Sequence, residues 1–229
     1  MRAGAVSRRE LLRVAVAGAG VVAVASCAGT GGQAAPREPV AAGPTTAPRP
    51  TSGGTAGGGA LIVFFSRAGE NYWDGGRRDL EVGSTEVLAT MIAERTGIDL
   101  HRVTAADPYP HAYDETVARN VREQDEDARP QIAEPLPDLA GYGTVILASP
   151  IWNVRPPMIM STFLDGVSLA GTTILPVTTH AMSGLGRAPE VYATFAPDAV
   201  VGEGLAVRGE RVADAGPEID RWVRAAGIG

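Results

Sequence analysis

Apolar residues recur along the chain in runs that are each long enough for one buried strand, beginning at 60–65. Later runs span 142–149, 172–178 and 199–207, whereas 98–103 alternates between apolar and polar residues. Unbroken runs are typical of strands covered on both faces, and alternation indicates an edge or half-exposed strand. Pro176 predicts a strand end or bulge within its run, and glycines break the last run.

Helical patterns fill the intervals between these runs. They span 86–95, 113–123, 157–164, 188–195 and 217–226. In the second helix Val117 and Val121 are expected to form the apolar side, and in the last Ile219, Trp222 and Val223 form an apolar stripe. Five strand–helix units in series predict an α/β fold with a parallel sheet covered by helices on both faces. Ligands bind such sheets beyond the carboxyl ends of the strands, so the loops after strands one, three and four are candidate sites.

The first of these loops contains small and hydroxyl-bearing residues in two separated parts. Ser66 and Arg67 follow the first strand, and Ser84 and Thr85 begin the first helix after an interruption at 70–82. Hydroxyl groups, together with the unpaired N–H groups of a first helical turn, favour an anion such as a phosphate. Arg67 either adds positive charge to this site or points to solvent. The alternative is a ligand-free loop in which Thr85 caps the helix.

The other two loops carry an aromatic residue and a group of glycines. Trp152 lies in a proline-bracketed loop at 149–157, which favours a platform for a planar ring over the usual fate of tryptophan in a core. The glycines of 178–186 allow the backbone to approach a ligand closely. A nucleophilic Ser183 is rejected, because Ala181 and Leu185 replace the two glycines that a strand–turn–helix elbow requires.

Charge and composition exclude several functional classes. The first 59 residues hold six arginines and two glutamates, so residues 60–229 hold 14 basic and 24 acidic groups, a net charge of −10. This argues against nucleic-acid binding, which depends on neutralising phosphates. The histidines at 101, 111 and 180 are too scattered to predict a metal site, and only His180 lies near a candidate loop. No acid–base pair predicts a catalytic residue.

The N-terminal sequence is interpreted as an export signal over 1–27. Ser7, Arg8 and Arg9 begin a segment similar to a twin-arginine signal, an apolar stretch follows, and 24–27 resembles a lipobox that ends in Cys27. We therefore expect export and a lipid anchor on Cys27 at the outer face of the cytoplasmic membrane; the alternative is an uncleaved anchor. Residues 28–59 read as a flexible Ala/Gly/Pro/Thr linker, which leaves 60–229 as the folded domain.

Four segments together resemble a family, the flavodoxin-like FMN-binding proteins. They are Phe-Ser-Arg-Ala-Gly at 65–69, Pro-Tyr-Pro-His-Ala-Tyr at 108–113, Ser-Pro-Ile-Trp at 149–152 and Ser-Gly-Leu-Gly at 183–186. The resemblance implies a three-layer sandwich with a five-stranded parallel sheet in the order 2-1-3-4-5. It also implies FMN as a noncovalent cofactor.

The resemblance assigns the cofactor contacts to the three loops. It implies that the phosphate is surrounded by Ser66, Arg67, Ala68, Ser84 and Thr85. It implies that the isoalloxazine ring is flanked by Pro150, Ile151, Trp152, Asn153 and Val154. It implies that the pyrimidine side is bordered by Thr179, Ser183, Gly184, Leu185 and Gly186. The interruption at 70–82 departs from the family pattern and is interpreted as looping out, with Tyr72 and Trp73 covering the flavin, forming an interface or packing the insertion.

Three functions remain open at this point. The first is an FMN electron carrier that serves an unidentified redox partner protein or a quinone-like acceptor. The second is an FMN-dependent NAD(P)H:quinone-type reductase. The missing Gly-x-Gly-x-x-Gly fingerprint slightly favours the first, although flavoreductases also bind nicotinamide without it. The third is a lipoprotein that keeps the fold and lacks the cofactor.

Overall fold

The computed structural model describes residues 58–229. The predicted signal at 1–27 with Cys27, and the predicted linker at 28–59 except its last two residues, lie outside the described residues. Among the helices that are described, none has the length and apolar character needed to cross a membrane.

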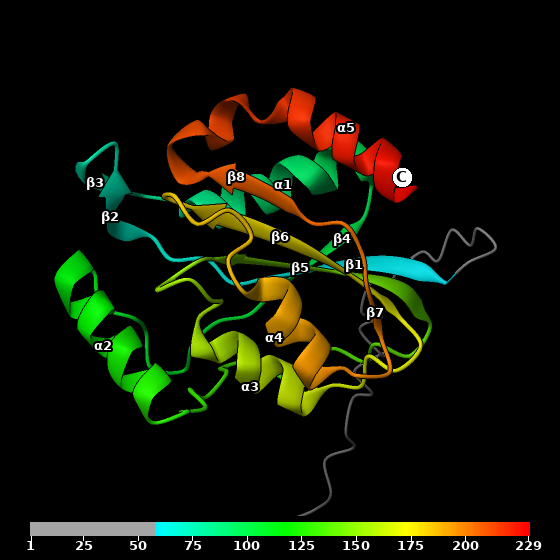
Figure 1. Cartoon of the computed structure of the whole chain (residues 1–229), viewed down its shortest axis with the longest axis horizontal. Helices are drawn as coiled ribbons and strands as arrows, with labels where there is room; N and C mark the ends of the chain where they lie inside the picture. Colours follow the sequence, from blue (N-terminus) through cyan, green and yellow to red (C-terminus); the bar gives the residue numbers. More distant parts are fainter. Residues whose placement is uncertain (1–57) are drawn as a thin grey trace, which may run out of the picture. The chain divides into compact units, whose positions relative to one another are not determined.

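A parallel sheet forms the centre of the domain. Its strands are β1 (Gly59–Phe64), β4 (Asp99–Arg102), β5 (Tyr142–Pro150), β6 (Thr173–His180), β7 (Val200–Val201) and β8 (Leu205–Arg208). The order is β4-β1-β5-β6, and β7 and β8 both pair with β6 in parallel. The expected order 2-1-3-4-5 is therefore confirmed, with the fifth strand in two pieces. The carboxyl ends of the strands meet at one edge, on the left in Figure 1.

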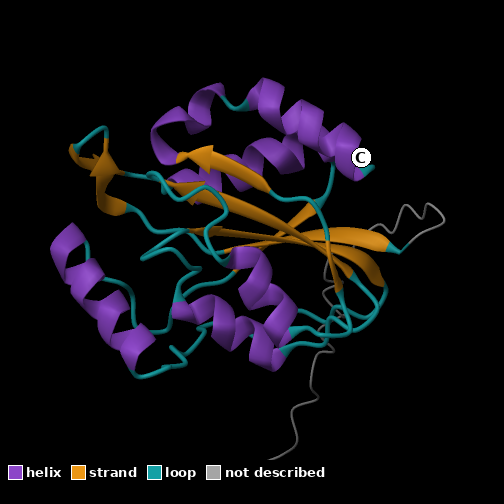
Figure 2. Cartoon of the chain, viewed as in Figure 1, coloured by secondary structure: helices purple, strands orange, loops and turns teal. Residues whose placement is uncertain are grey.

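Helices cover both faces of the sheet, which gives the three layers seen in Figures 1 and 2. The helices are α1 (Ser84–Thr96), α2 (Tyr113–Asp125), α3 (Met158–Gly166), α4 (Ala188–Phe195) and α5 (Gly216–Ala226). Alternate residues of each buried strand face opposite layers, so β1 places Val63 in one apolar cluster and Ile62 in the other. This is why the buried strands show continuous apolar runs in the sequence.

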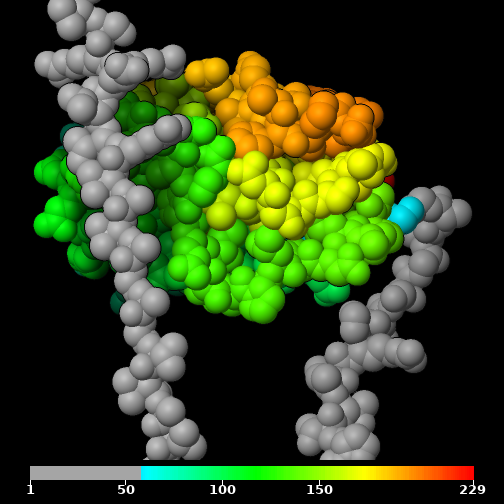
Figure 3. Space-filling view, turned by 90° about the horizontal axis from the view of Figure 1, so that it is seen from below, coloured from blue at the N-terminus to red at the C-terminus, as the bar shows by residue number. Residues whose placement is uncertain are grey.

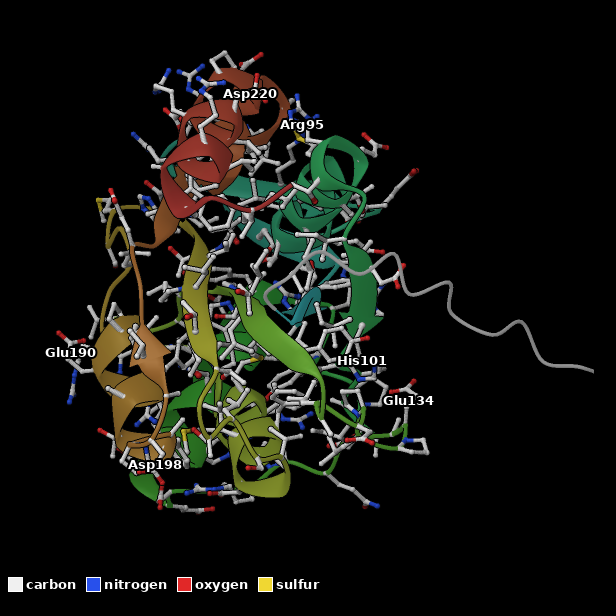
Figure 4. All side chains as sticks on the ribbon, turned by 90° about the vertical axis from the view of Figure 1, so that its right-hand side faces the viewer. Arg95, His101, Glu134, Glu190, Asp198 and Asp220 are labelled. Carbon is white, nitrogen blue, oxygen red and sulfur yellow. The ribbon has the colours of Figure 1, made fainter. Side chains whose placement is uncertain are left out.

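Each helical layer has its own connections. On one face Arg95 of α1 pairs with Asp220 of α5 across 3.1 Å (Figure 4). A short 3-10 helix, η1 (Gly209–Asp214), precedes α5 and packs beside α1. On the other face α3 contacts α4. Figure 3 looks onto this second face, where the orange surface of α4 adjoins the yellow and green surface of earlier segments.

Pro176 does not end or bulge β6, so that prediction was wrong. It lies within the strand, in regular register with Leu147 of β5. On its other side β7 pairs only as far as Ile174 and β8 begins at Val177. Pro176 therefore faces the gap between the two pieces of the fifth strand, where no partner requires its missing N–H.

Helix α2 buries its polar side, which also contradicts the sequence expectation. Val117 and Val121 are each 41% exposed, whereas Glu123 is buried. Glu123 accepts hydrogen bonds from the Tyr109 hydroxyl at 2.8 Å and from Arg119 Nε at 2.7 Å. Burial, together with the bond to Glu123, raises the pKa of Tyr109. Arg119 lies within the helix, whereas Tyr109 lies outside it, so the periodicity of the helix alone does not reveal the whole set of partners.

Candidate functional site

A pocket lies at the carboxyl edge of the sheet, among all three loops selected from the sequence. Its lining comes from Ser66, Arg67, Asn71, Tyr72, Ser84, Thr85, Tyr113, Pro150, Ile151, Trp152, Thr179, His180, Ala181, Gly209 and Glu210. The pocket encloses about 120 Å³ and opens to solvent.

The two halves of the first loop meet at Gly83. The interruption leaves the loop as a hairpin, β2 (Gly69–Trp73) and β3 (Gly76–Leu80), and the chain then returns to the start of α1. An added Cβ at Gly83 would lie 2.8 Å from the carbonyl carbon of Arg67 and closer still to Ser66 Oγ and Arg67 O. Only glycine allows this approach. The interpretation that the insertion loops out is therefore correct.

The first turn of α1 points its N–H groups at this junction. Gly83 provides no side chain to cap the helix, and Ser66 Oγ accepts a hydrogen bond from Glu86 N at 3.1 Å. The positive end of a thirteen-residue helix is thus directed at the loop that carries Ser66 and Arg67. Thr85 does not cap the helix, because its Oγ1 lies 2.6 Å from Thr179 Oγ1 and joins the first loop to the third.

The Arg67 side chain is half-buried and forms no hydrogen bond to a side-chain carboxylate. Its guanidinium donates to the carbonyl oxygens of Pro110 at 2.9 Å and His111 at 3.0 Å, and also to Glu70 O. Its Nε is buried and has no partner within the described protein. Burial lowers the pKa of Arg67, while the charge of Glu70 opposes that effect. The arginine remains a cation beside the pocket, and no side-chain carboxylate bonds to it. Ala68 lies in a separate hollow that also contains Tyr109.

The hairpin is fixed to α2 on one side of the pocket. Glu70 Oε2 accepts a hydrogen bond from Tyr113 N at 3.0 Å, which caps the start of α2. Arg77 pairs with Asp114 across 2.7 Å, and its guanidinium carbon lies 3.6 Å from the centre of the Tyr113 ring. Figure 1 shows the hairpin and α2 together at the carboxyl edge.

The tip of the hairpin bonds to the opposite side of the pocket. Asp74 N donates to Glu210 Oε1 of η1 at 3.2 Å, so the hairpin bridges α2 and η1. Tyr72 lines the pocket beneath this bridge, whereas Trp73 lies outside it with Arg78 4.5 Å from its ring centre. Of the roles considered for the insertion, covering the site fits Tyr72, and packing within the hairpin fits Trp73.

The second loop contributes an apolar wall. Pro150, Ile151 and Trp152 line the pocket. The Trp152 ring is also packed edge-on against Phe65 and Tyr109, with centroids 5.7 Å and 5.1 Å away, so it is fixed from behind by the core.

Asn153 and Val154 form a tight turn beyond this wall and do not line the pocket. Their φ angles are 47° and 61°, the second being unfavourable for a β-branched residue. The turn is held because Val154 O accepts a hydrogen bond from Arg187 N at 2.7 Å.

The third loop lines the pocket with its first residues, and not with the later ones that the sequence suggested. Thr179 lines it as expected, followed by His180 and Ala181. The remaining predicted residues of this loop are outside the lining: Ser183, Gly184, Leu185 and Gly186. Leu185 packs towards Gly204. Gly186 has a φ of 54° and lies so close to Val154 O that an added Cβ would clash with it.

Seven lining residues were not among the predicted cofactor contacts: Asn71, Tyr72, Tyr113, His180, Ala181, Gly209 and Glu210. Tyr72 had been considered as a cover for the flavin and His180 as a residue near a candidate loop. The hairpin places Asn71 in the pocket, and its attachment to α2 places Tyr113 there. Gly209 and Glu210 follow β8 at the same carboxyl edge, so the rule that selected the other loops would have applied to the loop after the fifth strand as well.

The geometry combines an anion site with an apolar wall. Hydroxyl groups, a helix N-terminus and the Arg67 charge lie together at the first loop. Ile151 and Trp152 form the apolar wall. Such an arrangement suits a ligand that has a phosphate at one end and a planar ring at the other.

Comparisons with known proteins identify the family and the fold. A profile described as flavodoxin matches residues 81–226, which is more than half of the chain. No curated protein matches the chain. Among solved structures, a provisionally assigned flavoprotein from Bacteroides uniformis has 24% identity and a TM-score of 0.60, over 74% of this chain and 99% of its own. One from Bacteroides eggerthii has 24% identity and a TM-score of 0.59, over 75% and 99%.

A third structure is a flavoprotein from Lactobacillus acidophilus in complex with FMN. It has 16% identity and a TM-score of 0.51, over 72% of this chain and 98% of its own. At these identities the structural matches establish the fold. The profile match begins at residue 81, so it includes the α1 half of the first loop and leaves out β1, Ser66, Arg67 and the hairpin.

Proposed function

The chain belongs to the flavodoxin family, and on that premise we propose that it binds FMN noncovalently at the carboxyl edge of its sheet and carries electrons at the cell envelope. The cofactor is FMN, and its flavin supplies the electron-transfer chemistry when bound. The protein holds the phosphate, packs against the ring and limits access of water.

One observation carries this proposal: the close approach at Gly83 reassembles a split phosphate loop at the start of α1. That contact brings together the first-turn N–H groups and the Ser66 hydroxyl, and the Arg67 side chain lines the same pocket. A dianionic phosphate is stabilised by all three, since the helix dipole and the guanidinium are both positive there.

The apolar wall supports binding of the flavin ring. Ile151 and Trp152 present apolar surface on one side, and Tyr72 of the hairpin lies across the same pocket. The enclosed volume is smaller than the roughly 300 Å³ of a typical small-ligand site, so a flavin nucleotide would lie partly in solvent. Partial exposure suits transfer of electrons to a partner that does not enter the pocket.

The N-terminal sequence supports the proposed location. The residues similar to a twin-arginine signal and to a lipobox favour export and an anchor on Cys27. Twin-arginine export carries folded proteins, which suits a noncovalent cofactor that must be loaded before transport. The electron acceptor would then be a membrane or envelope protein, or a quinone-like molecule.

A flavin titration of the full chain tests the proposal. Quenching of FMN fluorescence with one-to-one stoichiometry is expected, and a chain that leaves the fluorescence unchanged would refute the FMN site. Trp152→Ala should weaken FMN binding about tenfold or more through loss of buried aromatic contact. Trp73→Ala is the matched control, because Trp73 lies outside the pocket; equal loss in both variants would exclude a direct role for Trp152.

The same preparation separates the carrier from the reductase. A carrier accepts electrons from a chemical reductant and shows no turnover with NADPH and a quinone. Sustained NADPH:quinone turnover would establish the reductase instead.

A further inference from the structure

Glu210 is an almost completely buried carboxylate whose two oxygens differ in their bonding. Its side chain is 2% exposed. Oε1 accepts hydrogen bonds from Asp74 N at 3.2 Å and from Arg208 at 3.4 Å. Oε2 is buried and has no hydrogen-bond partner among the described residues. A buried charged oxygen without a donor is costly, so its presence in the wall of a ligand pocket indicates that a ligand provides the donor.

His180 presents a second polar atom of this kind in the same pocket. Its Nδ1 is buried and has no partner in the described protein. It ends β6, in register with Arg208 of β8, and Glu210 is two residues further along. Burial, reinforced by the charge of Arg208 and opposed by that of Glu210, lowers the pKa of His180, so the imidazole is neutral at pH 7. A neutral imidazole pairs with a hydroxyl group as donor or acceptor.

The pocket is therefore electrically polarised. Arg67 carries a positive charge and the Glu210 carboxylate a negative charge in the same lining, and Gly209 O, beside Glu210, accepts a hydrogen bond from Ser84 at the start of α1 at 3.3 Å. A phosphate is attracted to the Arg67 side and repelled from Glu210. Oε2 therefore requires a hydrogen-bond donor that carries no negative charge.

We infer that Glu210 and His180 bind hydroxyl groups of the ribityl chain. The site then prefers FMN to a flavin phosphate whose side chain has no hydroxyl groups. This inference rests on the proposed FMN site. The ribityl chain fits because it joins phosphate to ring and carries uncharged donors along its length. Glu210 also holds Asp74 N through its other oxygen, so the bound sugar chain and the hairpin tip share one carboxylate.

The test compares FMN with a synthetic flavin phosphate whose five-carbon side chain has no hydroxyl groups, using fluorescence titration of the full chain. The wild-type protein should bind FMN about tenfold or more tightly than the analogue, the range expected for a hydrogen bond to a charged group. Glu210→Ala should lose most of that preference, by weakening FMN binding and leaving analogue binding nearly unchanged. Glu210→Gln tests the charge, because its amide replaces one oxygen acceptor with a donor.

Glu190→Gln is the control, since Glu190 is exposed on α4 and points outwards (Figure 4); it should keep the full preference. Equal wild-type affinity for the two flavins would overturn the inference. So would a Glu210→Ala variant that loses affinity for both flavins to the same extent, because this would mean that Glu210 acts only through the hairpin. A wild-type chain that binds neither flavin would refute the proposed function itself, a result distinct from both.

Discussion

Replacing Gly83 with alanine should damage the site and the fold together, because one methyl group would separate the two halves of the phosphate loop. Gly83 has a φ of −67°, so alanine causes no dihedral strain and the effect is purely steric. The added Cβ would be 2.8 Å from the Arg67 carbonyl carbon, about 0.6 Å short of ordinary van der Waals contact. Two of the three obstructing atoms belong to the backbone carbonyl of Arg67, which follows the buried strand β1 and cannot rotate away.

The magnitude follows from two opposing effects. Overpacking of this kind costs about 1–3 kcal/mol. Replacement of glycine by alanine returns about 0.4–1 kcal/mol by restricting the unfolded chain. Backbone atoms obstruct the methyl group, so the cost lies near the upper end of the overpacking range, and we expect a net loss of about 2 kcal/mol in the free energy of unfolding. FMN affinity should fall about tenfold, since Ser66 and Arg67 are displaced from the start of α1.

Urea denaturation of the flavin-free protein and FMN titration measure the two effects separately. Gly76→Ala is the matched control, because an added Cβ there would approach Trp73 O only to 3.7 Å and the residue is exposed in β3. If Gly83→Ala and Gly76→Ala give the same denaturation midpoint and the same affinity, the junction at Gly83 is not what assembles the site.

Two further predictions concern protonation and location. The pKa of His180 is lowered in the folded state, so His180 stabilises the fold fully above its unfolded pKa of about 6.5, and this stability is lost as pH falls through that value towards the folded pKa. His180→Gln should therefore lose less stability than wild type between pH 7.5 and pH 5.5 in urea denaturation; an unchanged pH dependence would contradict the assignment. The proposed anchor at Cys27 predicts that the wild-type chain sediments with membranes and that Cys27→Ser releases it, and membrane retention of the variant would exclude the lipid anchor.

The strands and most helices were predictable because the core imposes its pattern on the sequence. β5 and β6 read as continuous apolar runs, since α1 and α5 cover one face of the sheet and α3 and α4 the other. The hairpin was missed because β3 is exposed along nearly its whole length and carries no apolar alternation. A local signal was available: Asp74 and Gly75 have φ angles of 45° and 86°, and an Asp-Gly pair favours this kind of hairpin turn.

The site was predictable only where its residues follow strands already identified. Ser66, Trp152 and Thr179 lie in loops that the carboxyl-edge rule selected, and the family resemblance assigned their contacts. Tyr113 was not selected in this way, because the hairpin attaches it to the pocket through the bond from Tyr113 N to Glu70 across 43 residues. Glu210 follows β8 at the same edge and was missed because the rule was not applied to the fifth strand. Helix α2 shows the same limit in part, since its buried Glu123 pairs with Arg119 within the helix and also accepts a hydrogen bond from Tyr109, which lies outside it.

The gap opposite Pro176 has a consequence for how the molecule meets its neighbours. An outer strand with a full row of free backbone groups can be extended by a strand from another chain, and so can start aggregation. Here the outer strand is split into the two-residue β7 and the four-residue β8. Filling the gap by replacing Gly202 and Gly204 alone would not yield a continuous ladder, because Pro176 would still lack its donor. The proline and the glycines protect this edge jointly, and removing the protection requires changes in both strands.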